Sequence, residues 1–123
     1  MYLVIDNSLN EKIIFHTSLN TKWVQHDFDR TDKGLLSLVD DLLKKMEIGL
    51  SDLQGIAVVV GVGKFTATRI ATTVANTLAL TLKIPVLGVE AFSDNIGSRL
   101  AQTPVGIYIS AQYSAPANIG GKK

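Results

Sequence analysis

The chain has 123 residues, of which 46% are hydrophobic and 19% charged, and its formal net charge is +1. This composition predicts a single compact domain and excludes a disordered chain. The nearly neutral charge argues against strong unaided binding to a nucleic-acid backbone. The absence of cysteine excludes disulfides, thiolate metal sites and a cysteine nucleophile.

The sequence also predicts no membrane segment. The uncharged run that most resembles a span, residues 70–82, is shorter than a bilayer-spanning helix and contains several threonines. The apolar run at the N-terminus has no basic residue before it and ends at Asp6, unlike a signal peptide. We therefore expect a cytoplasmic protein.

The first thirty residues predict three strands. Residues 3–5 form a continuous apolar run of the kind found in buried strands, and turn residues follow it. Residues 12–16 and 22–28 predict two further strands, joined by a turn over residues 18–21. Three strands with short links favour an antiparallel meander.

The next part of the chain alternates helices with strands. Apolar residues recur at helical spacing over residues 35–46, after Thr31 and Asp32 as candidate caps. Residues 56–60 are apolar without polar alternation, as in a central strand buried on both faces. A second helix is predicted from Thr66 to about Leu82, followed by a strand over residues 84–89.

The end of the chain gives weaker signals. We expect a short helix within residues 90–100, a last strand over residues 105–109 and a loose tail over residues 111–123. Three antiparallel strands followed by parallel strands and helices is the layout of ribonuclease-H-like and actin-like half-domains. The predicted fold class is therefore α/β, with one such half-domain over residues 1–110.

The glycines between the central strand and the second helix resemble the end of a phosphate loop. A Walker A motif would need glycine where Val58 stands and serine or threonine where Phe65 stands. A dinucleotide fingerprint would need glycine in place of Thr66. We interpret the segment with Gly61 and Gly63 as a tight turn that needs backbone freedom.

Asp6 is a candidate metal ligand at the end of the first strand. A nuclease of the ribonuclease H type needs several carboxylates around two metal ions, and the central strand supplies none. We therefore interpret Asp6 as a turn residue.

His16 and His26 are the only histidines of the chain. A two-residue turn at positions 19–20 would place His16 opposite Trp23 and His26 opposite Ile13. The two imidazoles would then not converge on a zinc ion. We predict no catalytic residue, no metal site and no cofactor.

The second helix is the most informative element, because after Arg69 it has no charged residue until Lys83. We expect its row of large apolar side chains to pack on the sheet, and its small and hydroxyl-bearing side to lie against another helix. Either the first helix covers that side completely, or part of it meets another subunit. The large row comprises Ile70, Val74, Leu78 and Leu82, and the small row comprises Ala67, Ala71, Ala75 and Ala79.

Several motifs, in this order along the chain, resemble the bacterial TsaB (YeaZ-like) family. The turn and the start of the second helix are similar to the family signature GxGPGSFTGxRIG, and residues 84–89 to its IPVxGV motif. Residues 1–8 and 50–53 are similar to its first strand and to the linker before its central strand. The residues that match the signature turn are Gly61, Gly63, Phe65, Thr66 and Arg69.

The chain also departs from this pattern. Val62, Lys64 and Ala67 stand where the family usually has proline, serine and glycine, and Asn7 replaces threonine. Family members usually have a second actin-like half of similar size, and this sequence ends soon after that half would begin.

The resemblance implies an actin-like half-domain with a role in making threonylcarbamoyladenosine (t6A) on tRNA. In that family TsaB is a non-catalytic partner of its paralogue TsaD, which carries out the transfer, and TsaE is an ATPase of the same complex. The implied partner is a TsaD-like subunit in a heterodimer, with a TsaE-like ATPase as a further member and a homodimer as the alternative. The implied interface lies on the two long helices and comprises Leu35, Leu38, Leu42, Ala67, Ala71, Thr72, Ala75, Asn76 and Ala79.

Two other classes of function stay open from the sequence. One is an actin-like nucleotide-binding ATPase completed by self-association, in which Asp6, Ser8, Gly61 and Gly63 would face phosphate or metal. Tight magnesium-dependent nucleotide binding would favour it. The other is a homodimeric structural protein, which failure to co-purify with any TsaD-like protein would favour.

Overall fold

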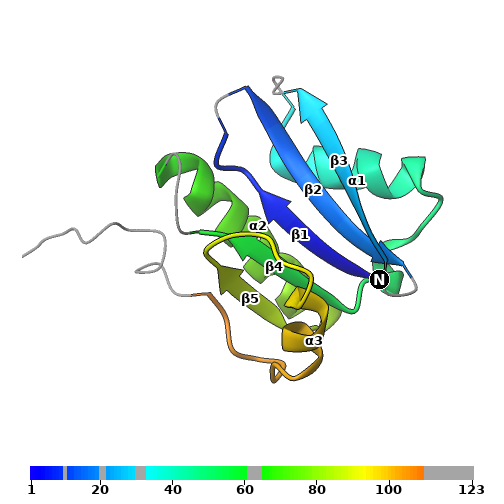
Figure 1. Cartoon of the computed structure of the whole chain (residues 1–123), viewed down its shortest axis with the longest axis vertical. Helices are drawn as coiled ribbons and strands as arrows, with labels where there is room; N and C mark the ends of the chain where they lie inside the picture. The colour runs from blue at the N-terminus through cyan, green and yellow to red at the C-terminus, as the bar shows by residue number, and fades with distance from the viewer. Residues whose placement is uncertain (10, 20–21, 30–32, 61–64, 110–123) are drawn as a thin grey trace, which may run out of the picture.

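The computed structural model describes residues 1–9, 11–19, 22–29, 33–60 and 65–109 (Figure 1). Its strands form one five-stranded sheet in the order β3-β2-β1-β4-β5. The elements in chain order are β1 (Tyr2–Asp6), β2 (Lys12–Leu19), β3 (Lys22–Asp29), α1 (Leu35–Lys45), the 3-10 helix η1 (Leu50–Asp52), β4 (Gly55–Val59), α2 (Phe65–Leu82), β5 (Val86–Val89) and α3 (Ile96–Ala101).

The sheet combines an antiparallel half with a parallel half. β1 pairs antiparallel with β2, and β2 pairs antiparallel with β3. β1 also pairs with β4, and β4 with β5, in parallel. This topology confirms the predicted α/β fold with a three-stranded meander and added parallel strands.

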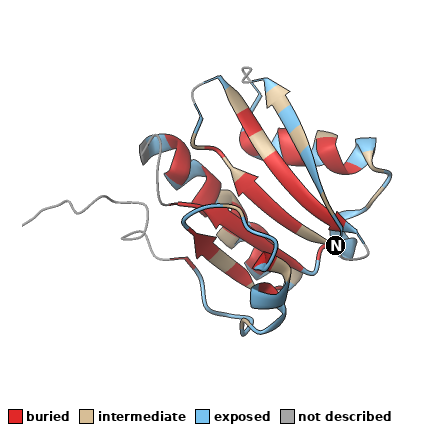
Figure 2. Ribbon diagram, viewed as in Figure 1, coloured by how far each residue is buried: buried red, intermediate tan, exposed pale blue. Residues whose placement is uncertain are grey.

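Helices cover both faces of the sheet (Figure 1). Leu3 and Ile5 of β1 join the larger core cluster, which includes apolar residues of α1 and α2. Val4, which points to the opposite face, joins a smaller cluster with Ile96 and Leu100 of α3. All five residues of β4 are buried, because this strand is sandwiched between the two clusters (Figure 2). The expectation of a strand buried on both faces is thereby confirmed.

Both long helices are followed closely by a residue with left-handed backbone conformation, and neither residue is glycine. Glu47 and Lys83 each have φ of 58°. The following amides donate back into the last turn, from Ile48 N to Leu43 O at 2.9 Å and from Ile84 N to the α2 backbone at 3.1 Å. This arrangement satisfies carbonyls that would otherwise lack partners at the helix end.

The element boundaries differ from the predictions in several places. Gly34 is the residue that caps α1, without a side-chain hydrogen bond, and Thr31 and Asp32 lie outside the described residues. α2 begins at Phe65, one residue before its predicted start at Thr66. β2 continues to Leu19, three residues beyond its predicted end, and β3 ends at Asp29, one residue later than predicted.

The last part of the chain also differs from the expectation. α3 is confined to Ile96–Ala101, and the preceding residues form a loop. The strand predicted over residues 105–109 is not formed. The turn residues Gly61 and Gly63 and the tail over residues 111–123 lie outside the described residues. Among the helices of the described chain, none combines the length and apolar character needed to cross a bilayer.

Candidate functional site

The end of β1 is tied to the start of α2, near the signature turn. The side-chain amide Nδ2 of Asn7 donates a hydrogen bond of 2.9 Å to Ala67 O, and Asn7 is buried. Asp6 Oδ1 accepts hydrogen bonds from the backbone amide of Ser8, at 3.0 Å, and from its hydroxyl. Asp6 therefore closes a local turn, in agreement with its interpretation as a turn residue.

The structure confirms only part of the predicted orientation of α2: Leu78 is buried in the larger core cluster with Val74 and Leu82 packed against it, but the alanine row is buried as well. Ala67, Ala71, Ala75 and Ala79 are all buried, and three of them belong to the larger core cluster. Ile70, which was expected to pack on the sheet, is instead 47% exposed. Small side chains let the helix backbone lie close to the sheet, so the alanine row occupies the inner side of the helix.

The other residues of the expected interface are also inside the monomer. Leu35, Leu38 and Leu42 of α1 are core residues. Thr72 is buried, and Asn76 is half-buried with its amide bonded to the backbone of Ile109. Eight of the nine side chains expected at an interface are buried within the chain itself, so they do not form a surface for another subunit, whereas half-buried Asn76 lines a groove.

The outer face of α2 is exposed and carries no charged side chain over residues 70–82. Within residues 70–82 its exposed side chains are hydroxyl-bearing or large and apolar. Two of them, Ile70 and Leu80, are exposed by 47% and 63%. At the first turn, Thr66 and Arg69 of the signature are exposed as well. We define the α2 outer face as Ile70, Thr73, Thr77, Leu80 and Thr81.

The outer side of α1 has a different character. Asp41 forms an ion pair of 2.7 Å with Lys33, and Asp40 forms one of 3.0 Å with Lys44 at helical spacing. These side chains are largely exposed, and such pairs contribute little to stability. The outer side of α1 is therefore a solvated, charged surface, in contrast to that of α2.

The register of the β2–β3 hairpin differs by two residues from the one assumed for the histidines. His16 lies opposite Gln25, and His26 lies opposite Phe15. The two histidines still point to opposite faces of the sheet, because their strand positions differ by one residue from a direct pair. Among the described residues, no three histidine, aspartate or glutamate side chains come together as a metal site would require.

Each histidine is held by contacts on its own face. His16 stacks on Phe92 with ring centroids 3.8 Å apart and an interplanar angle of 11°. Burial lowers the pKa of His16, against the opposing effect of Asp6 and Asp27. His26 Nε2 lies 3.0 Å from Thr17 Oγ1, and burial followed by the charge of Lys45 lowers the pKa of His26.

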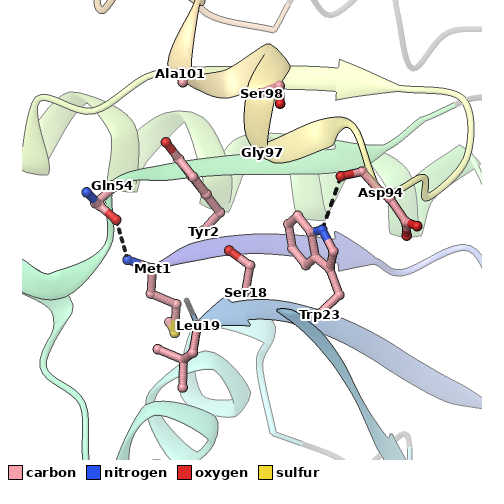
Figure 3. Close-up of a pocket in the computed structure, with 10 residues that line it drawn as sticks. All are labelled: Met1, Tyr2, Ser18, Leu19, Trp23, Gln54, Asp94, Gly97, Ser98 and Ala101. Carbon is pink, nitrogen blue, oxygen red and sulfur yellow. Dashed lines mark hydrogen bonds between the residues drawn. The ribbon is translucent and has the colours of Figure 1, made fainter. Parts of the chain in front are cut away.

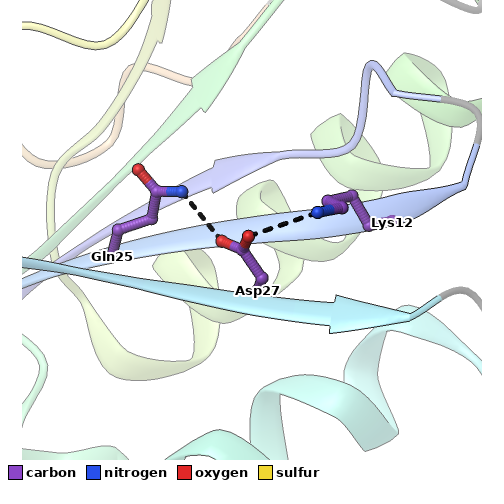
Figure 4. A network of polar contacts seen from close by, with 3 residues as sticks. All are labelled: Lys12, Gln25 and Asp27. Carbon is purple, nitrogen blue, oxygen red and sulfur yellow. Dashed lines mark hydrogen bonds and ion pairs between the residues drawn. The ribbon is translucent and has the colours of Figure 1, made fainter.

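A small polar network lies further along the hairpin (Figure 4). Gln25 Nε2 donates a hydrogen bond of 2.8 Å to Asp27 Oδ1, and Lys12 Nζ lies 3.4 Å from Asp27 Oδ2. The hydrogen bond from Gln25, with the contact from Lys12, lowers the pKa of Asp27. The three groups satisfy one another on an exposed surface, which is the usual arrangement on an edge strand.

The structure also contains a pocket that the sequence did not indicate (Figure 3). It has a volume of about 540 Å³ and lies between the start of β1, the turn end of the β2–β3 hairpin and α3. Trp23 Nε1 donates a hydrogen bond of 3.3 Å to Asp94 O, which holds the indole beside the pocket. A Cβ at Gly97 would lie 3.4 Å from the Tyr2 ring, so α3 runs close to the aromatic wall. The lining residues come from distant segments, which is why no local pattern revealed them.

Comparison with known proteins identifies the relatives of this chain. The family model described as TsaD, tRNA N6-adenosine threonylcarbamoyltransferase, matches residues 30–115, more than half of the chain. The tRNA threonylcarbamoyladenosine biosynthesis protein TsaB of Buchnera aphidicola is 34% identical over 99 residues, which cover 74% of this chain and 44% of that protein. A tRNA N6-adenosine threonylcarbamoyltransferase of Syntrophotalea carbinolica is 34% identical over 68 residues, 55% of this chain and 20% of that protein.

Solved structures give the same result. YeaZ from Pseudomonas aeruginosa superposes with a TM-score of 0.62 at 34% identity, over 72% of this chain and 42% of that chain. A second solved protein, described as similar to peptidase YEAZ from Pseudomonas aeruginosa, has a TM-score of 0.62 at 33% identity over the same shares. The chain thus spans less than half the length of these relatives. The chain therefore belongs to the TsaD family of tRNA threonylcarbamoyladenosine proteins and, within it, is TsaB/YeaZ-like.

Proposed function

We propose that the chain is a non-catalytic subunit of t6A biosynthesis in the cytoplasm and that it binds a TsaD-like partner through the α2 outer face. The observation that carries the proposal is the absence of charge from this face over residues 70–82. A helix whose outer side is solvated normally carries charged residues there. Exposed Ile70 and Leu80 on the same face favour contact with another protein.

The side chains of this face suit a second helix. Thr73 and Thr77 lie one turn apart and are both exposed, so they form a low ridge along the middle of α2. Helices pack with their axes about 8–10 Å apart, and short side chains at the contact favour the lower end of that range. A partner helix laid along this ridge would contact Ile70 and Leu80 near its two ends.

The geometry at the end of β1 supports a non-catalytic role over the rival ATPase. Asp6 is the acidic residue that a nucleotide-binding mechanism would use, and one of its carboxylate oxygens already accepts both hydrogen bonds from Ser8. Asn7 joins the end of β1 to the start of α2. We therefore propose that the enzymatic step belongs to the TsaD-like partner, with a TsaE-like ATPase as a further member of the complex.

A single substitution tests the partner surface. Thr73→Arg places a long charged side chain in the middle of the α2 outer face, where it would remain unpaired in the complex. We expect the variant to fold like the unaltered chain and to lose co-elution with the TsaD-like protein of the same organism in size-exclusion chromatography. Affinity measured by calorimetry should fall by at least about tenfold.

Val24→Arg is the matched control, because Val24 is 48% exposed on the edge strand β3, away from α2. It should assemble normally. A Thr73→Arg chain that is folded and binds the partner with unchanged affinity would overturn the proposed surface. An unaltered chain that never binds a TsaD-like protein would overturn the proposed function itself.

A further inference from the structure

The chain returns from α3 to α2, where Asn76 holds residue 109. Asn76 Nδ2 donates a hydrogen bond of 3.0 Å to Ile109 O, and Ile109 N donates one of 3.0 Å to Asn76 Oδ1. A neighbouring strand in an antiparallel sheet makes the same pair of bonds to one residue. Ile109 is buried in the larger core cluster, so the segment is fixed to α2 at this point.

The residues just before this attachment leave apolar side chains on the surface. Tyr108 lines a groove of about 300 Å³ together with Asn76, Thr77 and Leu80. Leu80 and Ile107 are each exposed by more than 60%. The segment over residues 104–109 contains no charged residue. The groove therefore has one wall from α2 and one from the returning segment.

These side chains are not scattered over the molecule. Half of the large hydrophobic residues exposed in the described part of the chain lie on α2 or within residues 105–108. Single exposed hydrophobic residues are normal, whereas a group of them on adjoining elements marks an interaction surface. Thr77 and Leu80 belong both to the groove and to the α2 outer face, so the two surfaces are continuous.

We infer that residues 105–108 and Leu80 form a second, apolar half of the partner surface, and that its occupant is an apolar face of the same partner helix. The inference rests on the proposed function. Large side chains of that helix enter the groove between Leu80 and Tyr108, while its backbone passes over Thr73 and Thr77. Asn76 is a positioning residue: it keeps residues 105–108 beside α2 through Ile109 and does not itself need to contact the partner.

Two variants of the full chain test this inference. Ile107→Ser removes an exposed apolar side chain, and Asn76→Ala removes both bonds to Ile109 while keeping a good helix former in α2. We expect each variant to weaken binding of the TsaD-like protein by about tenfold in calorimetry. In Asn76→Ala the amide of Ile109 should also exchange its hydrogen faster, which reports release of the segment directly.

Val24→Ser is the matched control for Ile107→Ser, since it also replaces an exposed apolar side chain, on β3. It should bind as the unaltered chain does. The inference is overturned if Ile107→Ser binds the TsaD-like protein with unchanged affinity. This test remains decisive even if Asn76→Ala fails to fold. If Thr73→Arg abolishes binding while Ile107→Ser does not, the proposed function stands and only the apolar extension is rejected. A chain that does not bind the partner at all rejects both.

Discussion

Thr72 and Thr17 are both buried threonines, but they differ in hydrogen bonding. Thr17 Oγ1 lies 3.0 Å from His26 Nε2, whereas Thr72 Oγ1 has no hydrogen-bond partner within the described part of the chain. Replacing a buried hydroxyl without a partner by a methyl group of similar shape is neutral or stabilising, and breaking a formed bond costs about 1 kcal/mol.

We therefore expect Thr72→Val to leave the free energy of unfolding unchanged or to raise it by up to about 1 kcal/mol, while Thr17→Val lowers it by about that amount. Urea denaturation monitored by circular dichroism measures both values. A Thr72→Val chain less stable than Thr17→Val would show that the Thr72 hydroxyl has a bonding role.

The stacked His16 predicts how stability depends on pH. Burial lowers the pKa of His16 in the folded chain below the ordinary value of 6.5, so the unfolded chain binds more protons just below that pH. Stability from this group is present above pH 6.5 and is lost as the pH falls below it, by at most about 1.4 kcal/mol per pH unit. The pKa of His26 is lowered as well and contributes in the same direction.

His16→Phe keeps an aromatic ring against Phe92 but removes the titrating group. We expect the variant to lose less stability than the unaltered chain between pH 7 and pH 5, in urea titrations at each pH. Part of the dependence should persist through His26, and His26→Gln should remove that part. An identical pH slope in the chain with and without His16 would contradict the assignment.

At the scale of elements, the orientation of α2 has a direct consequence for mutation. Ala75 is fully buried in the row that faces the sheet, and Thr73, two residues earlier, is exposed. Arginine at position 75 would overpack the core, at a cost of about 1–3 kcal/mol, and would bury a charge at several more. A small domain has a total stability of only about 5–15 kcal/mol.

We therefore expect Ala75→Arg to unfold the chain or to lower its melting temperature strongly. Thr73→Arg should stay within about 0.5 kcal/mol of the unaltered chain, because it lies on the surface and arginine is the better helix former. Thermal melts followed by circular dichroism separate the two. Equal melting temperatures for these variants would mean that the alanine row does not lie in the core.

At the scale of the whole molecule, the structure predicts that the isolated chain does not hydrolyse ATP. Asp6 is engaged by Ser8, and the residue that joins the end of β1 to α2 is the uncharged Asn7. Phosphate release with magnesium should stay at the level of a blank after several chromatographic steps. Turnover that follows the protein through these steps, and that Asp6→Ala abolishes but the surface control Asp94→Ala does not, would support the rival ATPase.

Much of this architecture was predictable from local sequence patterns. The apolar runs of β1 and β4 and the helical periodicity of α1 predicted these elements, because burial on one or both faces imposes a period on hydrophobic residues. The motifs along the chain also indicated the TsaB-like family, which the comparisons confirm. The absence of charge from α2 after Arg69 is likewise a property of the sequence alone.

The register of the hairpin and the returning segment depended on tertiary structure. A shift of two residues between β2 and β3 keeps every side chain on the same face, so the hydrophobic pattern does not distinguish His16 opposite Gln25 from His16 opposite Trp23. The bonds between Asn76 and Ile109 join residues 33 positions apart, and no local pattern reports such a contact.

The sequence by itself determined that α2 has one row of alanines, one row of large apolar side chains and a remainder without charge after Arg69. Only the tertiary structure decided how far each row is buried: all four alanines are buried, Leu78 of the large row is buried with them, and Ile70 is exposed. Both rows are apolar, so transfer from water favours burial of either, but a close-packed interior also has to fit the space above β4. The alanines fit a helix lying close to the sheet, and Ile70 and Leu80 are left at the surface, where the proposed partner would cover them.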